Sequence, residues 1–108
     1  MSSDDIKSKI DNLVRENKVL IFMKGTPEAP QCGFSKATVD IFRQLGASIK
    51  AVDVLGQPDY REGVKAYTNW PTIPQVFING KFIGGCDIVR ELNQKGELAN
   101  LVKEAGAK

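Results

Sequence analysis

An uninterrupted apolar run, Val19–Met23, does most to limit how this chain can fold. Five apolar residues without alternation predict a strand that is buried on both faces, as in a sheet covered by helices. A loop rich in proline follows, and four apolar residues then recur at helical spacing: Phe34, Ala37, Ile41 and Leu45. Residues 48–54 predict a second strand. Strand, helix and strand in this order imply a right-handed crossover between parallel strands, so we expect an α/β fold.

The second half of the chain predicts a hairpin. Asn79-Gly80 separates the apolar runs Gln75–Ile78 and 81–83, and Asn-Gly between two such runs is the strongest short hairpin signal. Two antiparallel strands therefore join the parallel pair. Amphipathic periodicity and helix-start signals predict the remaining helices at Ser3–Glu16, at 59–67, after Gly84-Gly85-Cys86-Asp87 to about Gln94, and at 97–105. In the helix that ends near Gln94 we expect Ile88 and Leu92 to face inward.

Composition restricts the class of protein. A chain of 108 residues with 42% hydrophobic content fits one domain, which we expect to span residues 1–108. The net charge is +2 with both signs interspersed, so neither nucleic acid nor an anionic membrane is an expected partner. No apolar run could span a membrane, and the N-terminus lacks a secretory signal pattern. We expect a cytoplasmic protein, with the mitochondrial matrix as the alternative if a targeting segment was removed.

The sequence contains no histidine and two cysteines, Cys32 and Cys86. A cysteine–histidine catalytic pair, an imidazole base and imidazole metal ligands are thereby excluded. Two cysteines cannot complete a four-thiolate metal site within one chain. Any metal centre of that kind needs ligands from outside the chain.

Cys32 is the candidate for the chemistry because it directly precedes the helix after the proline-rich loop. Unpaired backbone N–H groups and the helix dipole stabilise a thiolate at such a position. The alternative is an inert buried cysteine that behaves as a small hydrophobic residue. A loop with two prolines and a glycine is a poor place to bury a side chain, which favours a functional role for Cys32.

Three further features each allow a bound ligand or anion, and each has a simpler structural alternative. Lys24 follows the carboxyl end of a buried strand, where ligands bind in open α/β sheets. Arg61 lies in the opening turn of a helix, a poor place for a cation unless an anion is near. Gly84-Gly85 precedes a helix and allows close approach of an anion to the backbone. The alternatives are solvated surface charges and an ordinary turn.

Four motifs together resemble the monothiol glutaredoxins of the CGFS type: Lys24, Cys32-Gly33-Phe34-Ser35, Trp70-Pro71-Thr72-Ile73-Pro74 and Gly84-Gly85-Cys86-Asp87. Their order and spacing match the family nearly end to end. The resemblance implies a thioredoxin-like fold, with a four-stranded mixed sheet flanked by helices on both faces. It also implies that Pro74 is cis and faces Cys32, although the frequencies of X-Pro bonds alone favour trans.

The resemblance further implies glutathione as a ligand and assigns three groups of residues to it. Lys24 and Arg61 would hold the glycyl carboxylate, the backbone of Thr72 and Ile73 would pair with the tripeptide, and Gly85, Cys86 and Asp87 would meet the γ-glutamyl end. Ser35 stands where dithiol relatives have a second cysteine. Cys86 is then the only cysteine that could resolve a disulfide at Cys32.

Members of this type typically act in iron–sulfur cluster storage and transfer. The leading hypothesis is therefore a glutathione-dependent carrier that is a monomer when apo and a homodimer when it holds a two-iron two-sulfur cluster. Two copies of Cys32 and two glutathione thiolates would be the ligands, and apo iron–sulfur proteins would receive the cluster. Whether a BolA-like partner replaces one subunit stays open.

Two other hypotheses remain. The protein could be an enzyme that reduces glutathione mixed disulfides through Cys32, because both functions use the same thiolate. It could also be a redox-inert adaptor, for which Cys32 would be dispensable.

Overall fold

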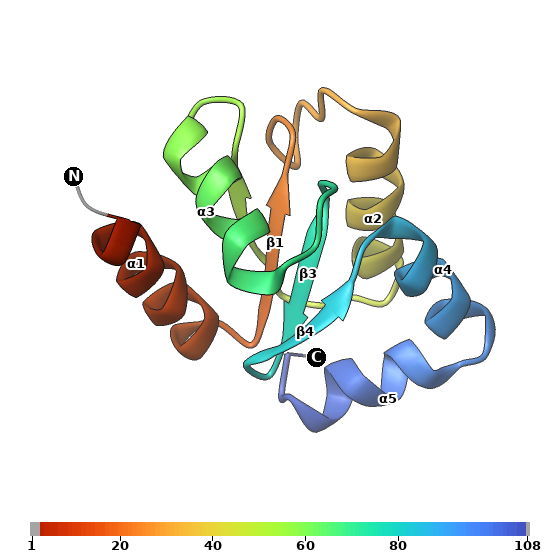
Figure 1. Ribbon diagram of the computed structural model, residues 1–108. Helices are drawn as coiled ribbons and strands as arrows, with labels where there is room; N and C mark the ends of the chain where they lie inside the picture. Colours follow the sequence, from red (N-terminus) through yellow and green to blue (C-terminus); the bar gives the residue numbers. More distant parts are fainter. Residues whose placement is uncertain (1–2, 108) are drawn as a thin grey trace.

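The computed structural model describes residues 3–107, so residues 1, 2 and 108 of the expected domain lie outside the described part. Helices and strands follow one another from the N-terminus to the C-terminus (Figure 1). Their order is α1 (Ser3–Glu16), β1 (Val19–Met23), α2 (Gly33–Gln44), β2 (Lys50–Asp53), α3 (Pro58–Thr68), β3 (Gln75–Ile78), β4 (Lys81–Gly84), α4 (Cys86–Gln94) and α5 (Glu97–Glu104). Every predicted helix and strand is present.

The four strands form one mixed sheet in the order β2-β1-β3-β4. β1 pairs in parallel with β2 and antiparallel with β3, and β3 pairs antiparallel with β4, as the sequence predicted. The strand predicted at 48–54 is shorter and covers Lys50–Asp53. Ser48 lies before this strand, and its backbone N–H donates to the carbonyl of Ala107 instead of to a neighbouring strand.

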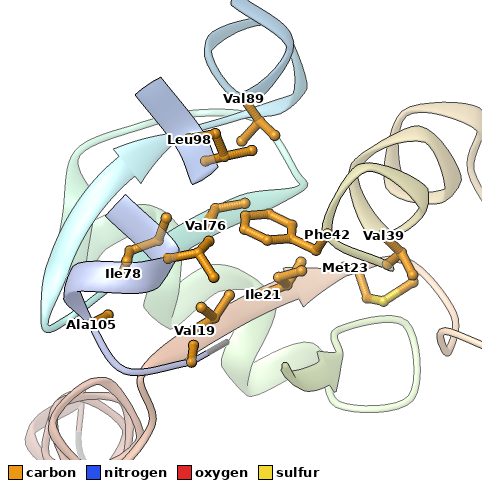
Figure 2. Close-up of a cluster of buried hydrophobic side chains, with 12 residues drawn as sticks. Val19, Ile21, Met23, Val39, Phe42, Val76, Ile78, Val89, Leu98 and Ala105 are labelled. Atoms are coloured by element: carbon orange, nitrogen blue, oxygen red, sulfur yellow. The ribbon is translucent and has the colours of Figure 1, made fainter. Parts of the chain in front are cut away.

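Helices cover both faces of the sheet: α1 and α3 lie on one side, and α2, α4 and α5 lie on the other (Figure 1). β1 supplies both cores because side chains alternate across a strand. Val19, Ile21 and Met23 pack beneath α2, α4 and α5 (Figure 2), whereas Leu20 and Phe22 pack beneath α1 and α3. This alternation places the carboxyl end of β1 between the two layers.

The buried face of α2 differs from the predicted one. Phe34 was expected inside but is 58% exposed, whereas Val39 and Phe42 are fully buried. Two hydroxyl residues, Ser35 and Thr38, occupy the same buried face, and an apolar pattern cannot reveal them. The Thr38 hydroxyl donates to the Phe34 carbonyl and so needs no solvent.

A similar shift of one residue occurs in α4. Val89 is fully buried there, and the predicted inward residues Ile88 and Leu92 are only partly buried. The Ile73–Pro74 peptide bond is cis, as the resemblance implied. Within residues 3–107, no helix is both long and apolar enough to cross a membrane.

Candidate functional site

One cleft of about 430 Å³ lies beyond the carboxyl end of β1, and all eight predicted site residues line it. They come from segments far apart in the sequence: Lys24, Cys32, Arg61, Thr72, Ile73, Gly85, Cys86 and Asp87. The structure thus brings the eight predicted site residues together in one cleft. Five more residues complete the lining besides Pro74: Phe34, Lys65, Trp70, Pro71 and Ile88.

Cys32 is the N-cap residue of α2, with an extended backbone at φ −150° and ψ 134°. The loop before it folds back on the end of β1, where Gly25 bridges Pro30 and the N–H of Gln31 donates to the carbonyl of Lys24 at 2.9 Å. Gly25 has a φ of 88°, and a Cβ there would lie 2.6 Å from the carbonyl oxygen of Ala29. Only glycine fits this turn, which fixes where the helix starts.

The helix start lowers the pKa of the Cys32 thiol below the ordinary value of a cysteine. The largest cause is the backbone N–H of Ser35, and the N–H of Phe34 and the charge of Lys24 act in the same direction. Partial burial opposes them but does not outweigh them. These groups stabilise the thiolate, which is the form of cysteine that attacks disulfides and binds metals.

Ser35 is fully buried, and its Oγ accepts a hydrogen bond from the backbone N–H of Lys24 at 3.1 Å. The hydroxyl therefore ties the first turn of α2 to the end of β1, on either side of the loop that carries Cys32. Sequence reasoning treated Ser35 only as a missing second cysteine. Its structural role depends on burial, which has no local sequence signal.

Three cations and one carboxylate give the cleft its charge. Lys24, Arg61 and Lys65 line it together with Asp87. The Nε of Arg61 and the Nζ of Lys65 lie 3.5 Å and 3.9 Å from the Oε2 of Glu62. These ion pairs are largely exposed and therefore contribute little to stability. Lys65 was not predicted, although its position four residues after Arg61 puts both on one helix face and could have revealed it.

The segment 70–74 forms a wall of the cleft. The Trp70 ring packs edge-on against Phe82, with ring centroids 5.9 Å apart. Ile73 is only 7% exposed, yet within residues 3–107 its backbone N–H and carbonyl have no hydrogen-bond partner. Buried backbone groups are nearly always paired, so these two groups are well placed to meet a ligand backbone.

The start of α4 also lines the cleft and lies against this wall. A Cβ on Gly85 would lie 3.2 Å from the carbonyl oxygen of Pro74, so the two segments touch through backbone. Cys86 is 6% exposed and Asp87 is exposed at the first turn of α4. Both cysteines are free thiols. Among residues 3–107, no three Cys, Asp or Glu side chains are arranged to hold a metal ion.

The family model for glutaredoxin matches residues 19–83. A protein from Synechocystis that is named an uncharacterised monothiol glutaredoxin is 52% identical over 94% of this chain and 94% of its own length. The mitochondrial monothiol glutaredoxin-5 of Saccharomyces cerevisiae is 45% identical over 97% of this chain and 72% of its own length.

Solved structures agree with the sequence relatives. A buckwheat glutaredoxin in complex with glutathione superposes with a TM-score of 0.88 at 31% identity, over 97% of this chain and 94% of that chain. The mixed sheet covered by helices on both faces is thus the thioredoxin-like fold of the glutaredoxins. Together with the match over residues 19–83, this shows that the chain belongs to the glutaredoxin family, in its monothiol branch.

Proposed function

We propose that this protein is a glutathione-dependent monothiol glutaredoxin that binds, stores and transfers an iron–sulfur cluster as a cluster-bridged homodimer. The observation that carries the proposal is the cleft in which the Cys32 thiolate lies together with cations and unpaired backbone groups. Glutathione presents complementary groups, namely two carboxylates, one ammonium, a peptide backbone and a thiol.

The charges of the cleft suit the two ends of glutathione. Lys24 and Arg61 would bind the glycyl carboxylate, and Lys65 adds a third positive charge on the same wall. At the other end, the backbone N–H groups of Gly85 and Cys86, near the start of α4, would meet the γ-glutamyl carboxylate. The carboxylate of Asp87 would bind the adjacent ammonium group. This orientation brings the ligand thiol toward Cys32.

The backbone of segment 70–74 suits the middle of the tripeptide. Ile73 can offer both its N–H and its carbonyl, which have no partner within the described residues. The Thr72 carbonyl already accepts a hydrogen bond from Gln75, so Thr72 would contribute through its N–H. Pairing of this kind adds a short strand to the protein without using side-chain chemistry.

The cluster is the cargo, and its ligands require two subunits. A two-iron two-sulfur cluster takes four thiolates, and each chain offers one accessible thiolate at Cys32. Two glutathione thiolates supply the other two. Because half of the ligands are exchangeable small molecules, we expect the cluster to be released readily to apo iron–sulfur proteins.

The alternative function is reduction of glutathione mixed disulfides, and the lowered pKa of Cys32 favours it equally. The Cys32 thiolate would attack the glutathione sulfur and release the target as a thiolate. A second glutathione thiolate would then attack the Cys32–glutathione disulfide, which regenerates Cys32 and forms glutathione disulfide. Ser35 cannot resolve this disulfide because it is a buried hydroxyl.

Cluster transfer to an apo acceptor, measured beside turnover of a glutathionylated peptide, distinguishes the two functions. We expect fast transfer and slow turnover from wild type, and neither from Cys32→Ser. Fast turnover without cluster transfer would support the alternative. If Cys32→Ser still transferred a cluster, the role of Cys32 would be wrong and an adaptor function would be favoured.

A cytoplasmic location is also part of the proposal. The mitochondrial name of the Saccharomyces cerevisiae relative keeps the mitochondrial matrix as the alternative. Apo iron–sulfur proteins are the proposed recipients, and a BolA-like protein would compete for the place of the second subunit.

A further inference from the structure

A fully buried amide side chain, Gln75, lies directly behind the wall of the cleft. Its Nε2 donates to the carbonyl of Trp70 at 2.9 Å and to the carbonyl of Thr72 at 3.1 Å. Its Oε1 accepts from the hydroxyl of Thr68 at 2.8 Å. Both N–H donors and the oxygen are therefore used, which fixes the orientation of the amide.

The segment that Gln75 holds has no regular structure of its own. Residues 70–74 lie between α3 and β3, and they follow Asn69, which has a positive φ of 56°. Two prolines in the segment lack an N–H donor. The amide of Gln75, the first residue of β3, joins this segment to Thr68 at the end of α3, and the backbone N–H of Trp70 also donates to the Thr68 hydroxyl oxygen at 3.2 Å.

The Gln75 amide points into the protein, away from the face that lines the cleft, because Gln75 is buried and is not a lining residue. It binds the carbonyls of Trp70 and Thr72 from behind, on either side of Pro71. The neighbouring backbone groups of Ile73 stay unpartnered within residues 3–107. The Gln75 side chain thus occupies the carbonyls of Trp70 and Thr72, whereas the backbone groups of Ile73 remain available to a ligand.

We propose that Gln75 is the positioning residue of the glutathione-binding wall. It presents the backbone of Thr72 and Ile73 to the ligand without touching the ligand or Cys32. This inference rests on the proposed glutathione function. It adds a buried residue that neither the charges of the cleft nor the Cys32 thiolate identifies.

The main test variant is Gln75→Met, which is uncharged and similar in shape but has no donor for the two carbonyls. Thr68→Val removes the hydroxyl that donates to Oε1 and accepts from the backbone N–H of Trp70, but it leaves the two carbonyl bonds of Gln75 in place and is the milder second variant. Gln44→Met changes an exposed glutamine at the end of α2 and is the matched control. The probe is S-methylglutathione, which cannot form a disulfide, and its affinity is measured by calorimetry.

We expect Gln75→Met to weaken S-methylglutathione binding on the order of tenfold, since two hydrogen bonds that order the binding segment are lost. Thr68→Val should weaken it less, and Gln44→Met should leave it unchanged. The alkylation rate of Cys32 as a function of pH should stay the same in all variants. A general loss of structure would change this rate as well.

Hydrogen exchange measures the positioning directly and needs no ligand. In Gln75→Met the amide of Trp70, which donates to the Thr68 hydroxyl oxygen, should exchange faster, while the amide of Ile21 in the central strand keeps its wild-type protection. Wild-type affinity in Gln75→Met, or equal acceleration at Ile21, would overturn the inference. Failure of wild type to bind S-methylglutathione would instead overturn the proposed function, and with it the ligand half of this inference.

Discussion

The Cys32 thiol owes its lowered pKa first to the backbone N–H of Ser35 and only in smaller part to Lys24. Lys24→Ala should therefore raise this pKa without returning it to the ordinary value of a cysteine. Site-resolved iodoacetamide labelling across pH measures the shift, with Lys103→Ala on α5 as the control. Cys32 of wild type titrating at or above the ordinary value would contradict the activated thiolate.

The same shift predicts how stability depends on pH. A thiol whose pKa is lower in the folded state stabilises that state above the unfolded pKa, and the contribution is lost as pH falls through the folded pKa. The stability of wild type relative to Cys32→Ser should accordingly increase as pH rises from the pKa of Cys32 in the folded state to its higher pKa in the unfolded state. Urea unfolding of both proteins at several pH values checks the sign, and a difference that shrinks with rising pH would contradict it.

Arg61 is expected to act through its charge. Arg61→Ala should weaken glutathione binding by roughly tenfold or more, since a charged hydrogen bond contributes about 1.5–3 kcal/mol. Added salt should reduce the difference between the variant and wild type. Calorimetry at two ionic strengths measures both effects, and Arg15→Ala on α1 is the control. Unchanged binding in Arg61→Ala would assign Arg61 to the solvated surface.

At the scale of elements, Gly63 sets how closely α1 and α3 pack. A Cβ at this position would overlap the Cγ2 of Ile6 and lie 3.0 Å from the Cδ1 of Ile10. Alanine in a helix normally gains about 1 kcal/mol over glycine, but overpacking costs roughly 1–3 kcal/mol. We expect Gly63→Ala to be net destabilising in urea unfolding.

The control for this prediction is the double variant Ile6→Ala with Gly63→Ala. Removing the side chain that the new methyl meets should recover part of the lost stability, so the two changes should not be additive. Additive losses, or a more stable Gly63→Ala, would show that α1 and α3 separate without cost.

The elements themselves could be predicted because each has a local signal. The apolar run of β1 and the Asn79-Gly80 turn each require only neighbouring residues to be recognised. The buried face of α2 could not be predicted from apolar spacing because Ser35 and Thr38 are buried with their hydroxyls satisfied by backbone. Ser35 is paired with Lys24 outside the helix and Thr38 with the Phe34 carbonyl one turn earlier, and neither pairing appears in an apolar pattern.

The candidate site, like the fold, could be predicted from the sequence only in part. Eight of its lining residues could be named from the sequence, and the structure places all eight in one cleft, whereas Lys65 was not predicted. Gln75 was recognised only as part of a strand, because nothing local distinguishes an amide that holds two carbonyls from one in solvent. Such positioning residues depend on where the backbone of a distant segment lies, and only the folded chain shows that.

For the whole molecule, exposed apolar side chains at the cleft would form the contact surface of the proposed homodimer. Phe34 is 58% exposed and lines the cleft, whereas Leu55 is 46% exposed and does not. If the clefts face each other across a shared cluster, Phe34→Ser should shorten the cluster lifetime several-fold, and Leu55→Ser should not. Both variants should keep the stability of the apo monomer within about 0.5 kcal/mol.

Decay of the visible absorption of the anaerobic holo protein measures the cluster lifetime. Equal lifetimes in the Phe34 and Leu55 variants would mean that the dimer does not form through the cleft face. Loss of apo stability in Phe34→Ser would mean that the side chain belongs to the core instead.

The central claim is that one cluster joins two subunits through two Cys32 thiolates and two glutathione thiolates. Anaerobic reconstitution followed by native mass spectrometry tests it most directly, using wild type, Cys32→Ser and Cys86→Ser with and without glutathione. Wild type and Cys86→Ser with glutathione should give a mass of two chains, two glutathiones and one two-iron two-sulfur cluster. Cys32→Ser should give only apo monomer. A cluster held by Cys32→Ser, or by wild type without any added thiol, would contradict the account.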